Sequence, residues 1–514
     1  MKQCYDAVVV GAGPAGSAVA RDVASRGFSV LLLEEDSVVG QPLHCSGLVT
    51  PRTLTLANVG EQVVQNELQG AVIQSPLGKE LPIGGGRVYA LAIDRVRLDQ
   101  AMAGQAQDSG AELIVGARFL ELERANGLVR AWVERQGRRT GVLTKLLIGA
   151  DGAQSRVAKQ LGVHRPYKTV IGLAAEVRAK EAATDQVTVL MDNDVAPGWF
   201  AWVIPLGDGR LRVGTGTANG LKPVDSFRRL RARLPQYFNG DPILGMAGGR
   251  IPLWSPMRLY SDNVLLVGDA ARQVKPTTGG GVYMGLVGAK HAARVAVEAL
   301  QREDFSAAFL SRYQKAFMAD AGDELKRGAD LQRLFAALSN AHLERLLARL
   351  RSERLAGLIN NYGDIDFPSR LLCELLRAAP SLAAFVRAPL RFPRAWLRQR
   401  ARQDTKALPG PCRWLLVGAG QRYGGDDGVG GAIDHQHISG QRTGDVDAVG
   451  DSIDRQAPRR AADSHGSNHS IAGAVQDGNG VGASLRHVDA ISGWVQGQAA
   501  RHAAQLHAGD QGVR

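Results

Sequence analysis

Three glycines near the start of the chain have the spacing that binds a nucleotide pyrophosphate. Gly11, Gly13 and Gly16 form a Gly-x-Gly-x-x-Gly motif directly after an apolar run at residues 5–10. The first glycine permits a tight turn, the second lets the backbone approach the pyrophosphate, and the third lets a helix pack against the strand. The Ala-rich stretch 17–25 predicts that helix, whose N-terminal N–H groups would face the phosphates.

A carboxylate follows the next apolar run. Residues 29–33 predict a second buried strand, and Glu34 stands near the spacing at which an acidic residue binds the ribose. A carboxylate there suits a bare ribose hydroxyl, so the sequence favours FAD or NAD over NADP. A glycine-rich turn without a ligand is the alternative interpretation, which the order of strand, motif, strand and acid disfavours.

Two later apolar runs also end in polar turns. Asp151 and Gly152 follow residues 147–150, and Gly268 and Asp269 follow residues 264–267. A carboxylate at such a strand end can accept a hydrogen bond from a ribityl hydroxyl. These turns, placed after the first motif, indicate FAD.

A glycine loop precedes the helix predicted from residue 282. Gly279, Gly280 and Gly281 follow the segment 276–278, Pro-Thr-Thr. Backbone N–H groups in this loop can approach the flavin ring and stabilise the negative charge that the ring gains on reduction.

Two other stretches resemble the geranylgeranyl reductase family, flavoproteins similar in fold to para-hydroxybenzoate hydroxylase. Residues 197–205, Pro-Gly-Trp-Phe-Ala-Trp-Val-Ile-Pro, are similar to the family pattern P-x-x-Y-x-W-x-F-P, with Phe200 in place of Tyr and Ile204 in place of Phe. Residues 41–47 resemble the family's cysteine-containing stretch and include Cys45. Arg95, four residues before Asp99, matches a family arginine near the cofactor. The resemblance covers residues 4 to about 400.

The resemblance implies an FAD-dependent reductase of isolated prenyl double bonds. Hydride from reduced flavin would go to one alkene carbon and a proton to the other, in a dry pocket. Cys45, with Trp202 and Phe200, is expected to act on the substrate, and core packing is the alternative role of all three. Strand alternation predicts that Trp199 and Ala201 face away from Phe200 and Trp202. The residues expected to bind FAD are Gly11, Gly13, Ala15, Gly16, Glu34, Cys45, Gly47, Arg95, Asp151, Gly152, Gly268, Asp269, Gly279, Gly280 and Gly281.

The hydrophobic patterning predicts an α/β fold with an inserted α+β substrate sheet. Residues 1–165 and 256–305 are expected to form a discontinuous, Rossmann-like, doubly wound FAD-binding domain. Residues 166–255 show the period-two alternation of an antiparallel substrate-binding sheet. Residues 306–405 form a helical, Arg-rich region. Local expectations are helices at 98–110 and 282–300, a strand at 111–115, an antiparallel pair at 128–133 and 141–147, and a hairpin at 201–213.

The composition changes after Lys406. Seven of the eleven histidines lie in residues 407–514, and Lys and Phe are absent there. We expect this tail to be disordered, because its hydrophobic residues follow neither a helical nor a strand period. Its composition is also typical of a polypeptide translated in the wrong reading frame.

Charge and cysteines limit the partners. The net charge of +12 suits an anionic membrane surface or acidic substrates, and no nucleic-acid motif accompanies it. The four scattered cysteines predict neither a metal site nor disulfides, and no apolar run is long enough to span a bilayer.

The nucleotide-binding sequence begins at residue 6, so we expect no signal peptide before it. A cytoplasmic protein is expected, peripheral on the inner face of the membrane if the basic segment 385–402 binds lipid.

Two other functions remain open on the sequence alone. A flavin-dependent monooxygenase or halogenase uses the same scaffold, and a non-catalytic flavin-binding remnant would also keep the motifs. The reductase predicts a prenylated small molecule or lipid as substrate. Its external reductant, NADPH or a ferredoxin-type protein, is not specified by any motif.

Overall fold

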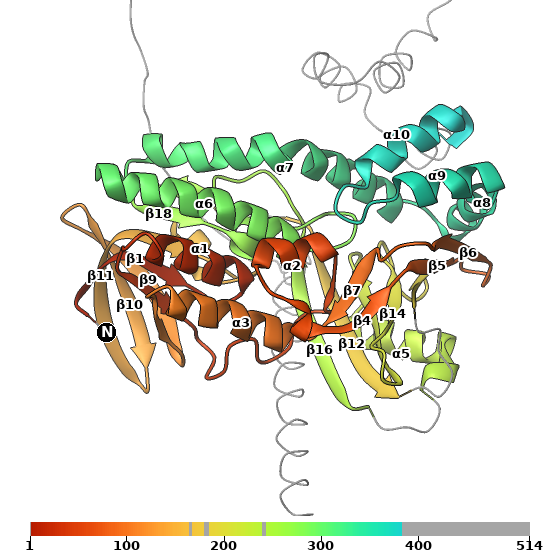
Figure 1. The fold of residues 1–514 in the computed structure, drawn as a ribbon. Helices are drawn as coiled ribbons and strands as arrows, with labels where there is room; N and C mark the ends of the chain where they lie inside the picture. The colour runs from red at the N-terminus through yellow and green to blue at the C-terminus, as the bar shows by residue number, and fades with distance from the viewer. Residues whose placement is uncertain (1, 164–166, 179–184, 239–242, 383–514) are drawn as a thin grey trace, which may run out of the picture.

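The computed structural model describes residues 2–163, 167–178, 185–238 and 243–382. Two large sheets lie side by side in Figure 1, and the helices α6 and α7 run above them. This arrangement confirms the α/β fold with a dinucleotide-binding part, a second sheet and a helical C-terminal segment.

The first sheet carries the nucleotide-binding motif. Its order is β17-β18-β11-β1-β2-β8, and every neighbouring pair except β17–β18 is parallel. The strands are β1 (Cys4–Val10), β2 (Val30–Leu33), β8 (Glu112–Ile114), β11 (Arg138–Gly149), β17 (Tyr260–Ser261) and β18 (Val264–Leu266). Strands β2 and β18 are short apolar runs that are buried along their whole length, as expected for central parallel strands. The expected antiparallel pair is confirmed as β10 (Leu128–Arg135) with β11, and β9 (Ala117–Ala125) pairs with β10.

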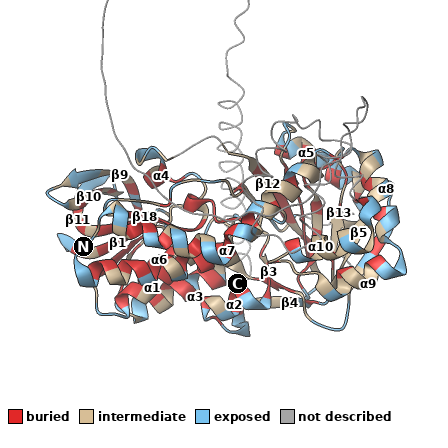
Figure 2. Cartoon of the chain, turned by 90° about the horizontal axis from the view of Figure 1, so that it is seen from above, coloured by how far each residue is buried: buried red, intermediate tan, exposed pale blue. Residues whose placement is uncertain are grey.

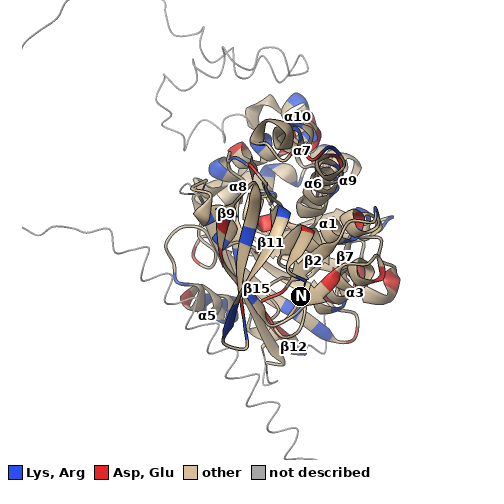
Figure 3. Cartoon of the chain, turned by 90° about the vertical axis from the view of Figure 1, so that its left-hand side faces the viewer, with Lys and Arg blue, Asp and Glu red and all other residues tan. Residues whose placement is uncertain are grey.

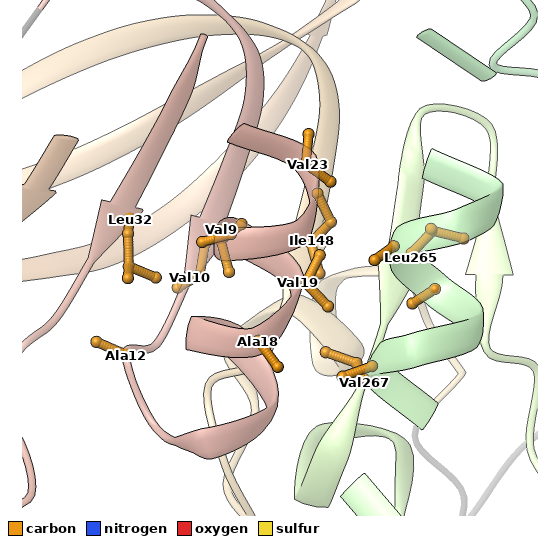
Figure 4. Packing of buried hydrophobic residues seen from close by; sticks show 14 of the residues in the cluster. Val9, Val10, Ala12, Ala18, Val19, Val23, Leu32, Ile148, Leu265 and Val267 are labelled. Carbon is orange, nitrogen blue, oxygen red and sulfur yellow. The ribbon is translucent and has the colours of Figure 1, made fainter. Parts of the chain in front are cut away.

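Three helices support this sheet. They are α1 (Pro14–Ala24), α3 (Arg95–Asp108) and α6 (Val282–Arg302), so the helices expected near residues 98 and 282 are confirmed. Figure 4 shows Val19 and Val23 of α1 close to Ile148 of β11. These side chains are fully buried, which stabilises the helix by about 2 kcal/mol for each large apolar side chain. The packing fixes the N-terminus of α1 at the carboxyl ends of β1 and β2.

The second sheet has the order β16-β12-β15-β14-β13-β5-β6. Its members are β5 (Gly70–Gln74), β6 (Glu80–Gly84), β12 (Thr169–Arg178), β13 (Gln186–Leu190), β14 (Ala201–Pro205), β15 (Arg210–Thr217) and β16 (Gly245–Pro252). The expected hairpin is β14–β15. Two findings differ from the expectation for residues 166–255. Strands β5 and β6 join from the N-terminal part, and β5 pairs with β13 in parallel.

Smaller elements join the two parts. A three-stranded sheet contains β3 (Leu48–Val49), β4 (Val64–Leu68) and β7 (Ala90–Ile93). The short helices are α2 (Pro51–Ala57) and α4 (Arg156–Gln160). Helix α5 (Pro223–Arg233) covers one face of the second sheet with Phe227 and Leu230, which leaves the other face for a ligand.

The C-terminal helices cover that other face. They are α7 (Ala307–Ala336), α8 (Asn340–Leu350), α9 (Glu353–Tyr362) and α10 (Ser369–Ala378). Leu347 of α8 and Ile359 of α9 pack with Leu81 of β6, and Figure 2 shows the buried residues gathered on the inner sides of the elements. Among the described residues no helix is long and apolar enough to cross a bilayer. The basic segment 385–402 and the tail 406–514 lie outside the described residues.

Candidate functional site

The three motif glycines have distinct surroundings. Gly11 has a φ of +102°, and a Cβ there would lie 2.4 Å from the carbonyl oxygen of Ala150; one on Gly16 would lie 2.0 Å from that of Gly11. Gly13 is extended, has no atom within 4 Å of a Cβ position, and lines the cavity. The first and third glycines are therefore required by packing, and the second leaves the space that a phosphate needs.

The N-terminus of α1 is open toward that space. Gly13 is its N-cap and gives no side-chain hydrogen bond, Pro14 follows at the first helical position, and Ala15 also lines the cavity. Uncapped N–H groups and the helix dipole favour an anion here.

Glu34 stands at the end of β2, as expected. Its carboxylate accepts hydrogen bonds from the backbone N–H groups of Ala12 (2.9 Å) and Asp36 (3.2 Å). Burial raises the pKa of this carboxyl above its ordinary value. Each carboxylate oxygen can accept a second bond, so Glu34 can also bind ribose hydroxyls.

Asp151 lines the cavity just after β11, and its carboxylate is held by its own turn. Its carboxylate accepts hydrogen bonds from Ser155 Oγ (2.6 Å) and from the N–H groups of Arg156 (2.7 Å) and Val157 (3.1 Å), at the start of α4. Oδ2 accepts both backbone bonds, whereas Oδ1 accepts only the bond from Ser155 and can accept a second one. The residue therefore shapes the wall of the cavity, next to Gly152, and can still accept a hydrogen bond from a ribityl hydroxyl.

Asp269 also fits the acceptor role. It follows Gly268 after β18, lines the cavity, and its carboxylate forms no hydrogen bond with the described residues. Burial raises the pKa of the Asp269 carboxyl to about 6, although the positive charge of Arg95 acts in the opposite direction. A half-buried carboxyl without a partner is costly unless a ligand hydroxyl satisfies it.

The glycine loop lies directly beside Asp269. A Cβ on Gly281 would lie 2.7 Å from Asp269 Oδ1, and Gly279 has a φ of +72°. Gly281 is the N-cap of α6 without a side-chain cap, and Gly279, Gly280 and Gly281 all line the cavity. The loop can therefore present backbone N–H groups to an anionic ring.

Cys45 and Arg95 meet at the cavity wall. The Arg95 guanidinium bonds Asp99 at 2.9 Å and lies close enough to Cys45 to interact with it electrostatically. Burial alone lowers the pKa of Arg95, but Asp99 and Cys45 raise it above its ordinary value. The N–H of Gly47 lies 3.4 Å from Cys45 Sγ. Cys45 therefore lines the cavity with its sulfur next to the Gly47 N–H and near the positive charge of Arg95.

Gly47 does not face the cavity, contrary to the expectation that it contacts the cofactor. A Cβ there would lie 2.5 Å from Arg212 Nη1 and 2.6 Å from the carbonyl oxygen of Ile93. Its φ of +67° and this close approach explain the glycine.

Sequence reasoning missed Arg212. It is buried in β15, pairs with Glu176 of β12 at 2.6 Å, and donates to the carbonyl oxygen of Ser46 at 2.5 Å. It therefore ties the Cys45 loop to the second sheet. The available signal was a pair of opposite charges within two otherwise apolar strands.

The aromatic residues form one cluster on the cavity wall. Trp199 stacks on Phe200 with ring centres 5.0 Å apart, and Phe200 meets Trp202 edge-on at 6.2 Å. All three line the cavity, so the expectation that Trp199 faces away was wrong. The strand begins only at Ala201, so its alternation does not extend to Trp199.

Glycines make room for the indole rings. A Cβ on Gly214 would lie 2.5 Å from the Trp202 ring, and one on Gly216 would lie 2.3 Å from the Trp199 ring. The rings therefore lie flat on the sheet and leave the cavity open.

One cavity of ≈1390 Å³ joins these groups. At one end are the motif glycines, Glu34 and Asp269. At the other end it continues as an apolar channel between the second sheet and the C-terminal helices, lined by Ile73, Val189, Met191, Leu350, Leu371 and Leu375. Such a mostly apolar cavity with a few placed polar groups is typical of a small-molecule site.

The residues present fit FAD. Gly13 leaves space where a pyrophosphate would lie, Asp269 presents an unpartnered carboxylate, and two helix N-termini open into the same cavity. The fold and this site define an FAD-dependent oxidoreductase. Residues 4–316 match the family model described as an FAD binding domain.

Curated relatives identify the family. The chain is 32% identical over 371 residues to digeranylgeranylglycerophospholipid reductase 2 of Methanopyrus kandleri, covering 69% of this chain and 92% of that protein. It is 31% identical over 392 residues to a reductase of the same name (number 1) from Methanococcoides burtonii, covering 74% and 92%. The chain belongs to the geranylgeranyl reductase family, as its motifs indicated.

Solved structures confirm the fold. A geranylgeranyl bacteriochlorophyll reductase-like protein from Thermoplasma acidophilum superposes with a TM-score of 0.67 at 23% identity, covering 74% of this chain and 99% of that one. A flavin-dependent brominase superposes with a TM-score of 0.58 at 17% identity, covering 78% and 100%. These similarities concern the fold alone, because several chemistries share it.

Proposed function

We propose that this protein reduces isolated carbon–carbon double bonds in the prenyl chains of a geranylgeranyl-type lipid. The main support is the single cavity that runs from the FAD-fitting cradle into an apolar channel. The names of its relatives point to the same substrate class. The leucine-lined end of this channel offers no hydrogen-bonding side chains to a polar substrate, whereas it can pack against an apolar chain.

Reduction of an isolated alkene needs a hydride on one carbon and a proton on the other. FAD, when bound and reduced, supplies the hydride. The chain must therefore supply the proton and exclude water. The apolar channel serves the second need, because Leu371 and Leu375 cover the face of the sheet that carries Trp202.

Cys45 is the proposed proton donor. Its thiol lies on the cavity wall, and its S–H bond would break as the proton moves to the alkene carbon. The resulting thiolate would be stabilised by the Gly47 N–H and by the Arg95 guanidinium. A proton from water would then restore the thiol.

We further propose that the protein meets its substrate at an anionic membrane surface, peripherally on the cytoplasmic face. The outer sides of α8, α9 and α10, which cover the channel, carry the exposed arginines Arg345, Arg349, Arg351, Arg354, Arg370 and Arg377. Basic stretches on α8 and α10 are blue in Figure 3. Each basic side chain near an anionic surface contributes about 1 kcal/mol.

The direct test is reduction of a prenyl lipid by the photoreduced, FAD-loaded protein under anaerobic conditions. We expect mass spectrometry to show successive additions of two hydrogen atoms to the prenyl chain, with oxidation of the flavin. Hydroxylation of an aromatic substrate in air, without alkene reduction, would instead support the monooxygenase alternative.

A further inference from the structure

A buried ion pair lies behind the glycine loop. Lys275 Nζ lies 2.6 Å from Asp366 Oδ1, and the two side chains are only 6% and 1% exposed. Lys275 also donates to the carbonyl oxygen of Ile365 at 3.2 Å. Asp366 Oδ2 accepts a bond of 2.6 Å from Thr50 Oγ1, so the pair is firmly held.

The Lys275 side chain lies against the loop itself. A Cβ on Gly280 would lie 2.6 Å from Lys275 Cε and 3.0 Å from its Nζ. Lys275 and all three loop glycines line the same cavity. The ammonium is therefore a fixed positive charge at the wall where the flavin ring fits.

The charges near this pair are balanced. Arg52 bonds Asp364 at 2.7 Å and lies 3.5 Å from Asp366, which gives two positive and two negative groups with Lys275. The Arg52 side chain is 54% exposed, so water and salt screen its charge. Asp366 is therefore the group that offsets the buried Lys275 charge.

Asp366 comes from the C-terminal helical layer. It lies between α9 and α10, and Leu371 and Leu375 of α10 line the apolar channel. The short segment 366–375 therefore contributes both to the wall of the channel and to the charge balance behind the glycine loop.

We propose that Asp366 is a positioning residue that sets the reduction potential of the bound flavin by holding and neutralising Lys275. A flavin that takes up two electrons and one proton gains one negative charge. The nearby Lys275 ammonium stabilises the negative charge of the reduced flavin. The Asp366 carboxylate offsets part of the ammonium charge and so weakens this stabilisation. The proposal depends on FAD binding but not on the prenyl substrate.

The test is the midpoint potential of the FAD-loaded full chain, titrated anaerobically with dithionite against reference dyes. Asp366→Asn should shift the potential to more positive values by at least a tenfold change in the reduction equilibrium, about 30 mV for two electrons. Lys275→Met should shift it to more negative values. Glu374→Gln is the matched control, because it removes the same charge from α10 of the same layer, where Glu374 pairs with Arg377 at 2.6 Å, and its shift should be much smaller.

Several results would overturn the proposal. Unchanged potentials in Asp366→Asn and Lys275→Met, or equal shifts in Asp366→Asn and Glu374→Gln, would show that the buried pair does not act on the flavin. If Asp366→Asn loses FAD, Lys275→Met decides the question, and loss of FAD from both would assign the pair to binding instead.

Discussion

Arg212 Nη1 lies 2.5 Å from the backbone carbonyl oxygen of Ser46, the residue that follows Cys45. The same guanidinium bonds Glu176 at 2.6 Å, so one buried side chain joins β15, β12 and the cysteine loop. The position of the proposed proton donor therefore depends on a residue of the second sheet.

Replacing Arg212 should loosen the cysteine loop. Arg212→Met leaves Ser46 and Glu176 with fewer partners and should cost about 1–3 kcal/mol of unfolding free energy. Iodoacetamide should alkylate Cys45 faster in this variant, measured by mass spectrometry on the folded protein. Arg210→Met, on the same strand but more exposed, is the control; equal alkylation rates in both variants and the parent would contradict the role of Arg212.

Gly13→Ala should weaken FAD binding without unfolding the protein. Gly13 is extended and its Cβ position is open, so alanine strains nothing in the chain but occupies the phosphate space. Overpacking costs about 1–3 kcal/mol, so we expect affinity to fall about tenfold or more in a fluorescence titration. Gly104→Ala on α3, also open at Cβ, should bind FAD normally. Normal binding by Gly13→Ala would place the pyrophosphate elsewhere.

Cys45→Ser should retain FAD and lose turnover. A missing proton donor typically costs a factor of about 10²–10⁴, and flavin absorbance should be unchanged. Cys4→Ser, at an exposed cysteine, is the control. Parent-like rates of alkene reduction in Cys45→Ser would mean that Cys45 only packs against the wall.

Asp269 should make the unfolding free energy of the FAD-free protein depend on pH in a distinctive way. Its pKa is raised to about 6 in the folded state, above the ordinary value of 3.8. A raised carboxyl pKa destabilises the folded state above about pH 6, and this penalty is relieved as the pH falls from 6 toward 4. Asp269→Asn should remove a penalty of about 1–3 kcal/mol at pH 7 but not at pH 4.

Urea unfolding of the FAD-free protein at both pH values measures this difference. Asp108→Asn, at an exposed aspartate on α3, should leave the pH dependence as it is in the parent. The same pH dependence in Asp269→Asn and the parent would show that the carboxyl is not penalised by burial.

Membrane binding should depend on anionic lipid. In co-sedimentation, recovery with vesicles should rise with anionic lipid content and fall with salt, because the attraction acts between charges. The segment 385–402 is expected to contribute arginines and the apolar residues Phe392, Trp396 and Leu397. Equal recovery in the supernatant with neutral and anionic vesicles at low salt would contradict this prediction.

The sequence predicted the nucleotide site well because local geometry defines it. Gly16 is required by its close approach to Gly11 within the first strand–turn–helix unit, and Glu34 directly follows the very next strand. Spacing alone therefore carries the information. For Asp151 the motif does not reveal that three hydrogen bonds from the start of α4 hold its carboxylate.

Long-range relationships were not predictable in the same way. Asp366 meets Lys275 across 91 positions of the chain, and neither residue belongs to a recognisable pattern. Gly47 resembled a cofactor glycine, but its constraint comes from Arg212 on another sheet. Such contacts depend on how the sheets pack, which strand and helix periods do not encode.

The parallel pairing of β5 with β13 has a consequence for how the chain acquires its structure. Gly70 pairs with Gln186, so the β5–β6 hairpin is synthesised long before the strand that it joins. Until β13 emerges, the hairpin has an unpaired edge of the kind that invites aggregation. The two halves of the molecule therefore cannot mature independently, and a gene fragment that ends before β13 should yield an insoluble product rather than a small FAD-binding protein.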